Sequence, residues 1–276
     1  MKIFRYPGVR PFESSESALF FGRDRDIVAL TETVRVEPLV VLFGRSGYGK
    51  SSLLNAGVLP KLRHYMMPVE VRLGEYTAGQ SLSPVDAVIQ KSVLGNAVAD
   101  YDALPVSLWT HFKKFPQPPG GYLLVFDQFE EFFSYPLSQQ RIFRDQLADL
   151  LSGEMPDDLR EASRALEPTD RKMLAQPVSI RVLFAIRSDR MHELDRLKDR
   201  LPSILHKRYE LKALSEEQAR DAIVRPAGLL AHDARHTPDD TDRTFASPSF
   251  EYRDDALKTI LEKLTESNTT HRAGIE

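Results

Sequence analysis

A glycine-rich segment directly after an apolar run constrains this chain more than any other feature of its sequence. Residues 39–43 read Leu-Val-Val-Leu-Phe, which is typical of a buried strand, and residues 44–51 read Gly-Arg-Ser-Gly-Tyr-Gly-Lys-Ser. The segment fits the pattern G-x-x-x-x-G-K-[ST] and leads into an expected helix over residues 50–63. The spacing predicts a phosphate-binding loop, because the alternative, a glycine turn that carries a lysine by chance, would seldom have both flanking elements.

Each residue type in this loop has a physical reason. Backbone N–H groups approach phosphate oxygens closely only where no Cβ obstructs the turn, which Gly44, Gly47 and Gly49 allow. Lys50 is expected to reach the β- and γ-phosphates, the Ser51 hydroxyl to bind Mg²⁺, and the following helix N-terminus to attract the polyanion. The predicted nucleotide contacts of the loop are Gly44, Arg45, Ser46, Gly47, Tyr48, Gly49, Lys50, Ser51 and Ser52.

A second apolar run ends in carboxylates. Residues 122–126 read Tyr-Leu-Leu-Val-Phe, Asp127 follows at once, and Glu130 and Glu131 stand shortly beyond. A magnesium ion on a triphosphate needs a carboxylate from a neighbouring strand, and we expect Asp127 to supply it. Glu130 and Glu131 are candidates for the base that polarises an attacking water. For either glutamate the alternative is a purely structural role at the start of a helix, where negative charge is favoured.

Two arginines are further candidates. Arg187 ends a third apolar run, at the carboxyl edge of the expected sheet where ligands of open α/β sheets bind, and is a candidate sensor of the γ-phosphate. The alternative for Arg187 is a surface ion pair with Asp189. Arg23, after Phe20 and Phe21, is a candidate contact to the base or sugar, with an ordinary surface arginine as the alternative.

Strand-like and helix-like segments alternate along the chain. Strands are expected at residues 38–43, 69–73, 122–126, 178–186 and, more weakly, 209–211. Helices are expected at residues 24–36, 50–63, 84–94, 137–175 with a break near 153–156, 215–226 and 254–264, with a short one around Trp109 and Phe112. This alternation predicts an α/β fold, a mostly parallel central sheet flanked by helices, with a short C-terminal helical extension.

A polar stretch over residues 232–249 predicts a linker, which divides the chain into a domain over residues 1–230 and an extension over residues 231–276. His232 and His236 within it are expected to lie in a solvated loop and not to bind a metal.

Composition limits which classes of partner and which cellular compartment are expected for this chain. A chain of 276 residues with 42% hydrophobic residues can bury a sizeable core, and a net charge of −3 gives no general attraction to nucleic acid. Cysteine is absent, and no apolar run approaches the ~20 residues that span a bilayer. Residues 1–7 contain a basic residue but are not followed by the apolar stretch of a secretory signal. These features predict a cytoplasmic protein with no membrane partner, for which nucleic acid is an unlikely ligand.

With these residues placed, the chain resembles the prokaryotic novel STAND group of P-loop signal-transduction NTPases, which is related to the NACHT ATPases. The similarity covers about residues 5–228 and is carried by residues 6–12 leading to Phe-Phe-Gly-Arg at 20–23, residues 44–52, Phe-Asp-Gln-Phe-Glu-Glu at 126–131, Ile-Arg-Ser-Asp-Arg at 186–190, and residues 209–227. The loop alone is generic, whereas two other segments taken together are more specific: the N-terminal arm, residues 6–23, and the acidic box, residues 126–131.

The resemblance implies a strand order and a biology. The phosphate-loop strand would neighbour the strand that ends in Arg187, which would neighbour the acidic strand; Arg187 would sense the γ-phosphate and Arg23 would contact the nucleotide. ATP or ADP and Mg²⁺ would be the ligands, and the protein would self-associate and work with sensor and effector modules, often in bacterial defence. Because such proteins continue into helical regions and sensing repeats, we expect this sequence to be part of a longer protein or to act with modules on other chains.

Three functions fit the sequence. The first is a slowly hydrolysing ATPase whose nucleotide state gates oligomerisation and effector activation. The second is a scaffold that holds nucleotide without turnover, and the third is a ring-forming ATPase acting on nucleic acid, which the acidic balance disfavours. A GTPase is less favoured because no N-K-x-D motif occurs.

Overall fold

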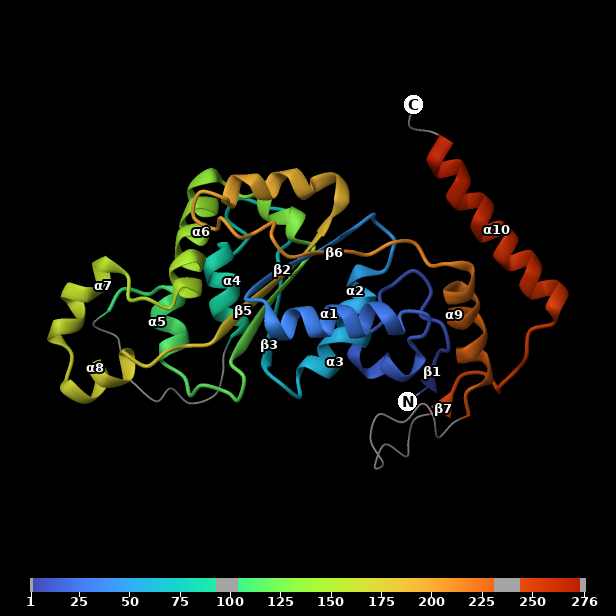
Figure 1. Cartoon of the computed structure of the whole chain (residues 1–276), viewed down its shortest axis with the longest axis horizontal. Helices are drawn as coiled ribbons and strands as arrows, with labels where there is room; N and C mark the ends of the chain where they lie inside the picture. Colours follow the sequence, from blue (N-terminus) through green and yellow to red (C-terminus); the bar gives the residue numbers. More distant parts are fainter. Residues whose placement is uncertain (1, 93–103, 231–243, 274–276) are drawn as a thin grey trace. The chain divides into compact units, whose positions relative to one another are not determined.

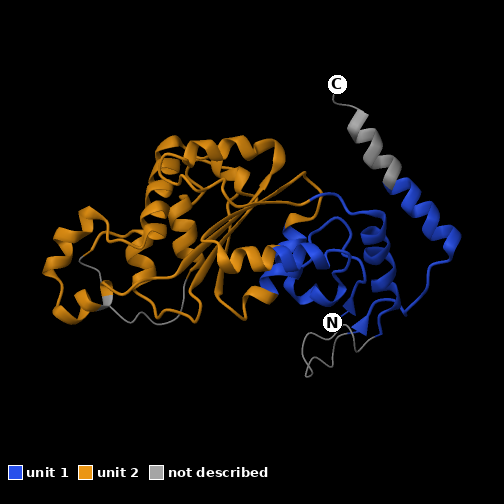
Figure 2. Ribbon diagram, viewed as in Figure 1, with its two compact units in different colours: residues 1–29, 51–60, 212–276 blue, residues 30–50, 61–211 orange. Residues whose placement is uncertain are grey.

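The chain folds into two compact units that do not follow its order in sequence (Figure 2). A computed structural model describes residues 2–92, 104–230 and 244–273. Unit 1 combines residues 1–29, 51–60 and 212–276, and unit 2 combines residues 30–50 and 61–211. The division expected at residue 230 stays a prediction.

Unit 2 is built on a five-stranded sheet (Figure 1). Its strands lie in the order β3 (Met67–Arg72), β4 (Tyr122–Asp127), β5 (Ile180–Arg187), β2 (Leu39–Gly44) and β6 (Arg208–Glu210). Every neighbouring pair is parallel. The expected α/β class is confirmed, and the strand that precedes the glycine-rich loop lies next to β5, which lies next to the acidic strand, as the resemblance implied.

Both faces of this sheet are buried, which explains why its strands are apolar throughout. On one face Leu124 and Phe184 join a core cluster that includes Phe143 of α6 (Leu137–Ser152). The residues that point to the other face, such as Leu123 and Leu183, are also fully buried. Each such side chain contributes about 1.5–3 kcal/mol by leaving water.

The helices of unit 2 begin and end at identifiable signals. The hydroxyl of Ser83 accepts a hydrogen bond from the Asp86 N–H and caps α4 (Pro84–Lys91). Gly153, with φ of 71°, ends α6 in the left-handed conformation that a side chain disfavours. The expected break after residue 152 is therefore confirmed. The other helical segments of this unit are α5 (Leu108–Lys113), η3 (Phe129–Ser134), α7 (Asp157–Ala162), η4 (Ser163–Ala165), α8 (Pro168–Leu174) and η5 (Ser188–Leu197).

Unit 1 pairs the first strand of the chain with a segment that lies more than 200 residues later in the sequence. Strand β1 (Lys2–Ile3) pairs in parallel with β7 (Thr244–Phe245), and the unit also holds η1 (Ser14–Leu19), α9 (Glu216–Gly228) and α10 (Asp254–Ala273). Two helical stretches run from one unit into the other along the chain: α1 (Asp24–Val36), and α2 (Lys50–Ser52) with η2 (Leu53–Val58) and α3 (Leu59–Leu62).

Five details differ from the sequence-based expectation. The helix expected over residues 84–94 ends at Lys91, and residues 93 and 94 lie outside the described residues. The helix after the glycine-rich loop has the expected extent but is π-helical over Leu53–Val58. Ser215 and Gln218 form a capping box at the start of α9, and the helix continues through Pro226 to Gly228 instead of closing at the proline. The Arg5 guanidinium donates to the Pro226 carbonyl at 2.7 Å and so pairs one of the carbonyls at the end of this helix. Part of the expected linker forms β7. Its partner β1 lies near the other end of the sequence. The last helix extends to Ala273, and His232 and His236 lie outside the described residues.

Candidate functional site

The glycine-rich loop lies between β2 and α2, as its spacing predicted. Gly44 ends β2, and a Cβ there would lie 2.6 Å from the Leu211 carbonyl oxygen, so the close approach of the β6 segment requires glycine. Gly47 and Gly49 have φ of 81° and 88°, a left-handed region that side chains rarely adopt. No atom lies within 4 Å of a Cβ built on either glycine, so this part of the loop is open.

The side chain of Lys50 turns back over the loop. Its Nζ donates to the carbonyl oxygens of Gly44 at 2.8 Å and Arg45 at 3.2 Å. Burial lowers the pKa of Lys50, while the carboxylates of Glu130 and Asp127 act to raise it. Lys50 is thus a half-buried ammonium that the charges of two carboxylates help to keep protonated, and an ammonium is a strong hydrogen-bond donor to phosphate oxygens.

The two serines after Lys50 differ in their surroundings. Ser52 accepts a hydrogen bond at 3.2 Å from the backbone N–H of Phe12, so its hydroxyl is engaged by the N-terminal arm in unit 1. The structure gives the Ser51 hydroxyl no hydrogen bond to any residue that it describes. Of the two, Ser51 is the one left for a ligand.

A sharp turn follows the acidic strand β4. Asp127 ends the strand and its Oδ1 accepts from the N–H of Gln128 at 3.0 Å. Gln128 has φ of 56° and ψ of 48°, and it is the one non-glycine residue with positive φ in the described part of the chain. A left-handed non-glycine residue costs on the order of 1–3 kcal/mol and is often found at functional sites.

The turn aims one of the two candidate glutamates inward. Glu130 is only 8% exposed, and its Oε2 accepts from the backbone N–H of Arg187 at 3.3 Å. Phe129, whose ring centroid is 4.1 Å from that of Phe184, anchors the same segment in the core. Glu131 is partly exposed, and its charge raises the pKa of Tyr135, an effect secondary to the burial of that tyrosine.

Arg187 lies at the end of β5, opposite Gly44 in the sheet register. Its Nε and Nη2 donate to the two carboxylate oxygens of Asp189 at 3.1 and 2.8 Å. The ion pair that the sequence left open as an alternative is therefore present, and the Arg187 side chain remains 43% exposed. An exposed pair of this kind is worth little, so an incoming phosphate can compete for the arginine.

Arg23 belongs to unit 1 and is not an ordinary surface arginine. It is 5% exposed and donates to Asp26 Oδ2 at 3.0 Å and to the Lys212 carbonyl at 2.9 Å. These bonds tie the start of α1 to the segment before α9. A contact of Arg23 with the base or sugar stays a prediction.

Two residues of this edge of the sheet, Arg72 and Gln128, had no functional role predicted from the sequence. Arg72 ends β3 opposite Asp127 in the register, and its guanidinium donates to the side-chain oxygen of Gln128, through Nε at 2.9 Å and through Nη2. Arg72 falls inside the strand expected over residues 69–73, whereas the observed β3 ends at Arg72, so the signal of a polar residue after an expected strand was absent at this point. What the sequence did not reveal is that β3 lies beside β4.

The donors present suit magnesium only together with a nucleotide. Among the described residues no group of three or more histidine, cysteine, aspartate or glutamate side chains is arranged to hold a metal ion. A serine hydroxyl, one carboxylate and phosphate oxygens are the hard oxygen ligands that Mg²⁺ prefers. Ser51 has such a hydroxyl and Asp127 such a carboxylate, and their joint use for Mg²⁺ stays a prediction.

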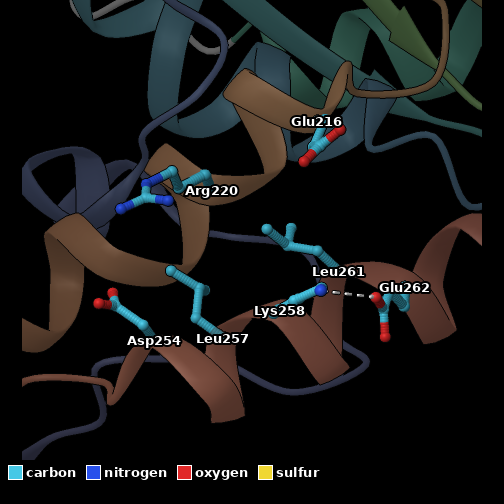
Figure 3. Close-up of a pocket in the computed structure, with 7 residues that line it drawn as sticks. All are labelled: Glu216, Arg220, Asp254, Leu257, Lys258, Leu261 and Glu262. Carbon is cyan, nitrogen blue, oxygen red and sulfur yellow. Dashed lines mark ion pairs between the residues drawn. The ribbon is translucent and has the colours of Figure 1, made fainter.

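A separate hollow of about 560 Å³ lies in unit 1, between α9 and α10 (Figure 3). Leu257 and Leu261 of α10 provide its apolar part, and Arg220 of α9 and Lys258 of α10 are among its charged residues. Lys258 is paired with Glu262 at 3.9 Å on the same helix (Figure 3). Charges of both signs line it, so it shows no preference for an anion such as a nucleotide.

In the part of the chain that the structure describes, none of the helices combines the length and apolarity that crossing a membrane requires. This agrees with the absence of long apolar runs in the sequence.

Comparison with known proteins identifies one family. A family model described as novel STAND NTPase 1 matches residues 6–267. No curated protein matches the sequence.

Solved structures are similar only at low identity. A Walker-type ATPase of Pyrococcus abyssi is similar with a TM-score of 0.46 and 15% identity over 77% of this chain and 59% of that chain. The ORC2 protein of Aeropyrum pernix, in its ADP form, is similar with a TM-score of 0.41 and 15% identity over 78% of this chain and 52% of that one. The chain thus spans little more than half the length of these proteins.

Proposed function

The chain belongs to the novel STAND NTPase 1 family, and from this premise we propose that it binds Mg-ATP, hydrolyses it slowly and uses the nucleotide state as a switch. Family membership makes it a P-loop NTPase. The choice of ATP, the turnover and the switch are the parts that we propose.

The observation that carries this proposal is the meeting of four charged groups at the carboxyl ends of three adjacent strands. Lys50 follows β2, Arg187 ends β5, Asp127 ends β4 and Glu130 lies shortly beyond it. The charges of all three partners act on Lys50. A triphosphate in this place would meet an ammonium, a guanidinium and open backbone N–H groups on one side, and carboxylates suited to a metal and a water on the other.

Each group has a distinct role in the proposed reaction. The loop N–H groups and Lys50 hold the β- and γ-phosphates, and Ser51 with Asp127 would hold Mg²⁺, which neutralises charge that develops between those phosphates. Glu130 is the better candidate for the residue that orients the attacking water, because it is buried and lies close enough to Lys50 for its charge to act on it. Arg187 would leave Asp189 and bind the γ-phosphate.

The contacts that distinguish ATP from ADP are strong enough for a switch. Moving a two-state equilibrium from 1:99 to 99:1 takes about 5.5 kcal/mol, and hydrogen bonds to charged groups contribute about 1.5–3 kcal/mol each. Two or three γ-phosphate contacts, from Lys50, Arg187 and the metal, reach that figure.

Loss of Lys50 tests nucleotide binding. At a hundredfold excess of ATP over its Kd, the unsubstituted protein is expected to gain about 2.7 kcal/mol of unfolding free energy, and Lys50→Ala is expected to lose this gain. Lys61→Ala, which removes an exposed lysine on α3, serves as the matched control. Thermal unfolding with and without Mg-ATP measures both, and equal stabilisation of Lys50→Ala and Lys61→Ala would refute the proposal.

Loss of the water-orienting carboxylate tests hydrolysis. Glu130→Gln is expected to lower phosphate release by about 10²–10⁴-fold while ATP binding is retained, and Glu131→Gln to have a smaller effect. Steady phosphate release by the purified protein measures both. Tight nucleotide binding with no release by the unsubstituted protein would favour the scaffold function instead.

The switch requires that the ATP and ADP forms differ in association. We expect the ATP-bound protein, trapped by Glu130→Gln, to self-associate more than the ADP-bound protein, as sedimentation at several concentrations would reveal. Equal association in both states would oppose the switch, and stimulation of hydrolysis by DNA or RNA would favour a nucleic-acid-dependent ATPase. The sensor and effector modules of the proposed switch would be further parts of the same protein or separate chains.

A further inference from the structure

The guanidinium of Arg72 is fixed on a neutral partner beside the proposed reaction centre. Two of its nitrogens, Nε at 2.9 Å and Nη2, donate to the same side-chain oxygen of Gln128. No ion pair joins Arg72 to a carboxylate in the described part of the chain, although it stands opposite Asp127 in the sheet register. A guanidinium that donates two hydrogen bonds to an amide oxygen fixes the position of that amide but neutralises no charge.

The residue that Arg72 holds is the strained one. Gln128, with φ of 56°, is in a conformation that glycine adopts freely and glutamine does not, and nothing in its own side chain relieves that strain. Such a conformation persists only where the surroundings impose it. Here Phe129 anchors the turn on the core side through Phe184, and Arg72 fixes it from the neighbouring strand β3.

The turn controls where two carboxylates point. Asp127 lies directly before Gln128 and bonds to its N–H, and Glu130 lies two residues after it with its carboxylate against the Arg187 N–H. If the backbone at Gln128 relaxed to a right-handed or extended conformation, the chain would leave β4 in a different direction and both carboxylates would move relative to Lys50. Displacements of about 1 Å in such a site can cost 10²-fold in rate.

We propose that Arg72 is a positioning residue, which holds Gln128 in the left-handed conformation and thereby aims Asp127 at the metal and Glu130 at the water. The inference rests on the proposed function, since it assigns these two carboxylates to Mg²⁺ and to hydrolysis. It adds a residue of strand β3 that does not itself touch the nucleotide.

The test combines turnover with a measurement that does not need turnover. Arg72→Ala is expected to lower kcat about 10- to 100-fold with little change in the Kd for metal-free ATP, and to reduce the gain in ATP affinity on adding Mg²⁺ toward that of Asp127→Ala. Arg72→Lys, which can still donate to Gln128, is expected to recover part of both. Arg63→Ala is the matched control, because it removes an exposed arginine that pairs with Glu70 of β3, the strand that also carries Arg72.

A double-variant comparison separates positioning from a general loss of stability. Gln128→Gly adopts the turn without strain but gives Arg72 nothing to hold, so adding Arg72→Ala to it is expected to cause no further loss of kcat or of the Mg²⁺ effect. Effects that multiply in the double variant, or an Arg72→Ala protein within twofold of Arg63→Ala in kcat and in the Mg²⁺ effect, would overturn the inference.

The outcome also shows which proposal has failed. If the unsubstituted protein binds Mg-ATP without turning it over, hydrolysis is wrong and the Mg²⁺ effect alone decides the role of Arg72. If the unsubstituted protein binds no ATP, the proposed function is wrong and the inference is overturned with it. Should Arg72→Ala fail to fold, the comparison of Arg72→Lys with Gln128→Gly carries the test.

Discussion

At the scale of single residues, Lys50 combines a function that its spacing predicts with a property that its surroundings create. Motif spacing alone assigns it to phosphate. Burial lowers its pKa, against the opposing effect of Glu130 and Asp127. Its ammonium therefore releases its proton at a lower pH than an ordinary lysine does.

This shift predicts a pH dependence of ATP affinity. A bound triphosphate favours the ammonium, so affinity is full below the pKa of the free lysine and falls as the pH rises through it. Because that pKa is lowered, the fall should begin below the pH of about 10.4 at which an ordinary lysine titrates. Calorimetric titration between pH 7.5 and 10 measures it, with Lys50→Gln as the control that has no proton to lose. A flat profile, or the same profile in Lys50→Gln, would contradict the prediction.

At the scale of elements, the entry of β4 between its two neighbours depends on a pair of glycines. Gly120 and Gly121 have φ of 74° and 83°, and Cβ atoms there would lie 1.8 Å from the Tyr65 carbonyl oxygen and 2.2 Å from that of Ser179. These carbonyls belong to the chain just before β3 and β5. The three backbones approach each other so closely at this point that no room is left for a side chain.

Gly120→Ala is therefore expected to destabilise unit 2 by about 2–4 kcal/mol, from the strain of a positive φ and the clash with Tyr65 together. Gly79→Ala is the matched control, because Gly79 has the same φ of 74° but no atom within 4 Å of its Cβ. We expect it to cost about 1 kcal/mol. Urea denaturation measures both, and equal costs would show that the close approach at Gly120 does not matter.

At the level of the whole molecule, Arg5 joins the N-terminal segment to residues 226–247, which lie far away in the sequence. This arginine is 4% exposed, lies 3.9 Å from the ring centre of Phe245 and donates to the carbonyls of Pro226 and Leu229 at 2.7 and 3.0 Å. It also donates to Ser247. A single side chain near the N-terminus thus satisfies the end of α9 and holds the segment that contains β7.

Arg5→Ala is expected to lower the stability of unit 1 by about 2–4 kcal/mol, because three buried or partly buried carbonyls lose their donor at once. Arg253→Ala, which removes an exposed arginine of the same unit whose partner Asp255 is exposed as well, should cost less than about 1 kcal/mol. Hydrogen exchange resolves the location: the last turn of α9 is expected to lose protection while β4 and β5 keep theirs. Uniform loss throughout the chain would contradict this account.

The local chemistry of this protein can be predicted from residues that are neighbours along the chain. The spacing of glycines and lysine at residues 44–51, the apolar runs, and Asp127 and Arg187 at their ends each depend on neighbours along the chain, and hydrophobic periodicity and turn chemistry express such relations directly. The α/β class and the extent of α1 were predicted for the same reason, and both are confirmed.

The strand ends that meet, and the partner to which each side chain bonds, could be known only from the tertiary structure. It brought β3 beside β4, and so joined Arg72 to Gln128; it buried Arg23 against Lys212, paired β1 with β7, and carried α9 past Pro226. Each of these contacts joins residues far apart in sequence, or depends on such a contact. Local patterns carry no record of such pairings, because these depend on how the whole core packs.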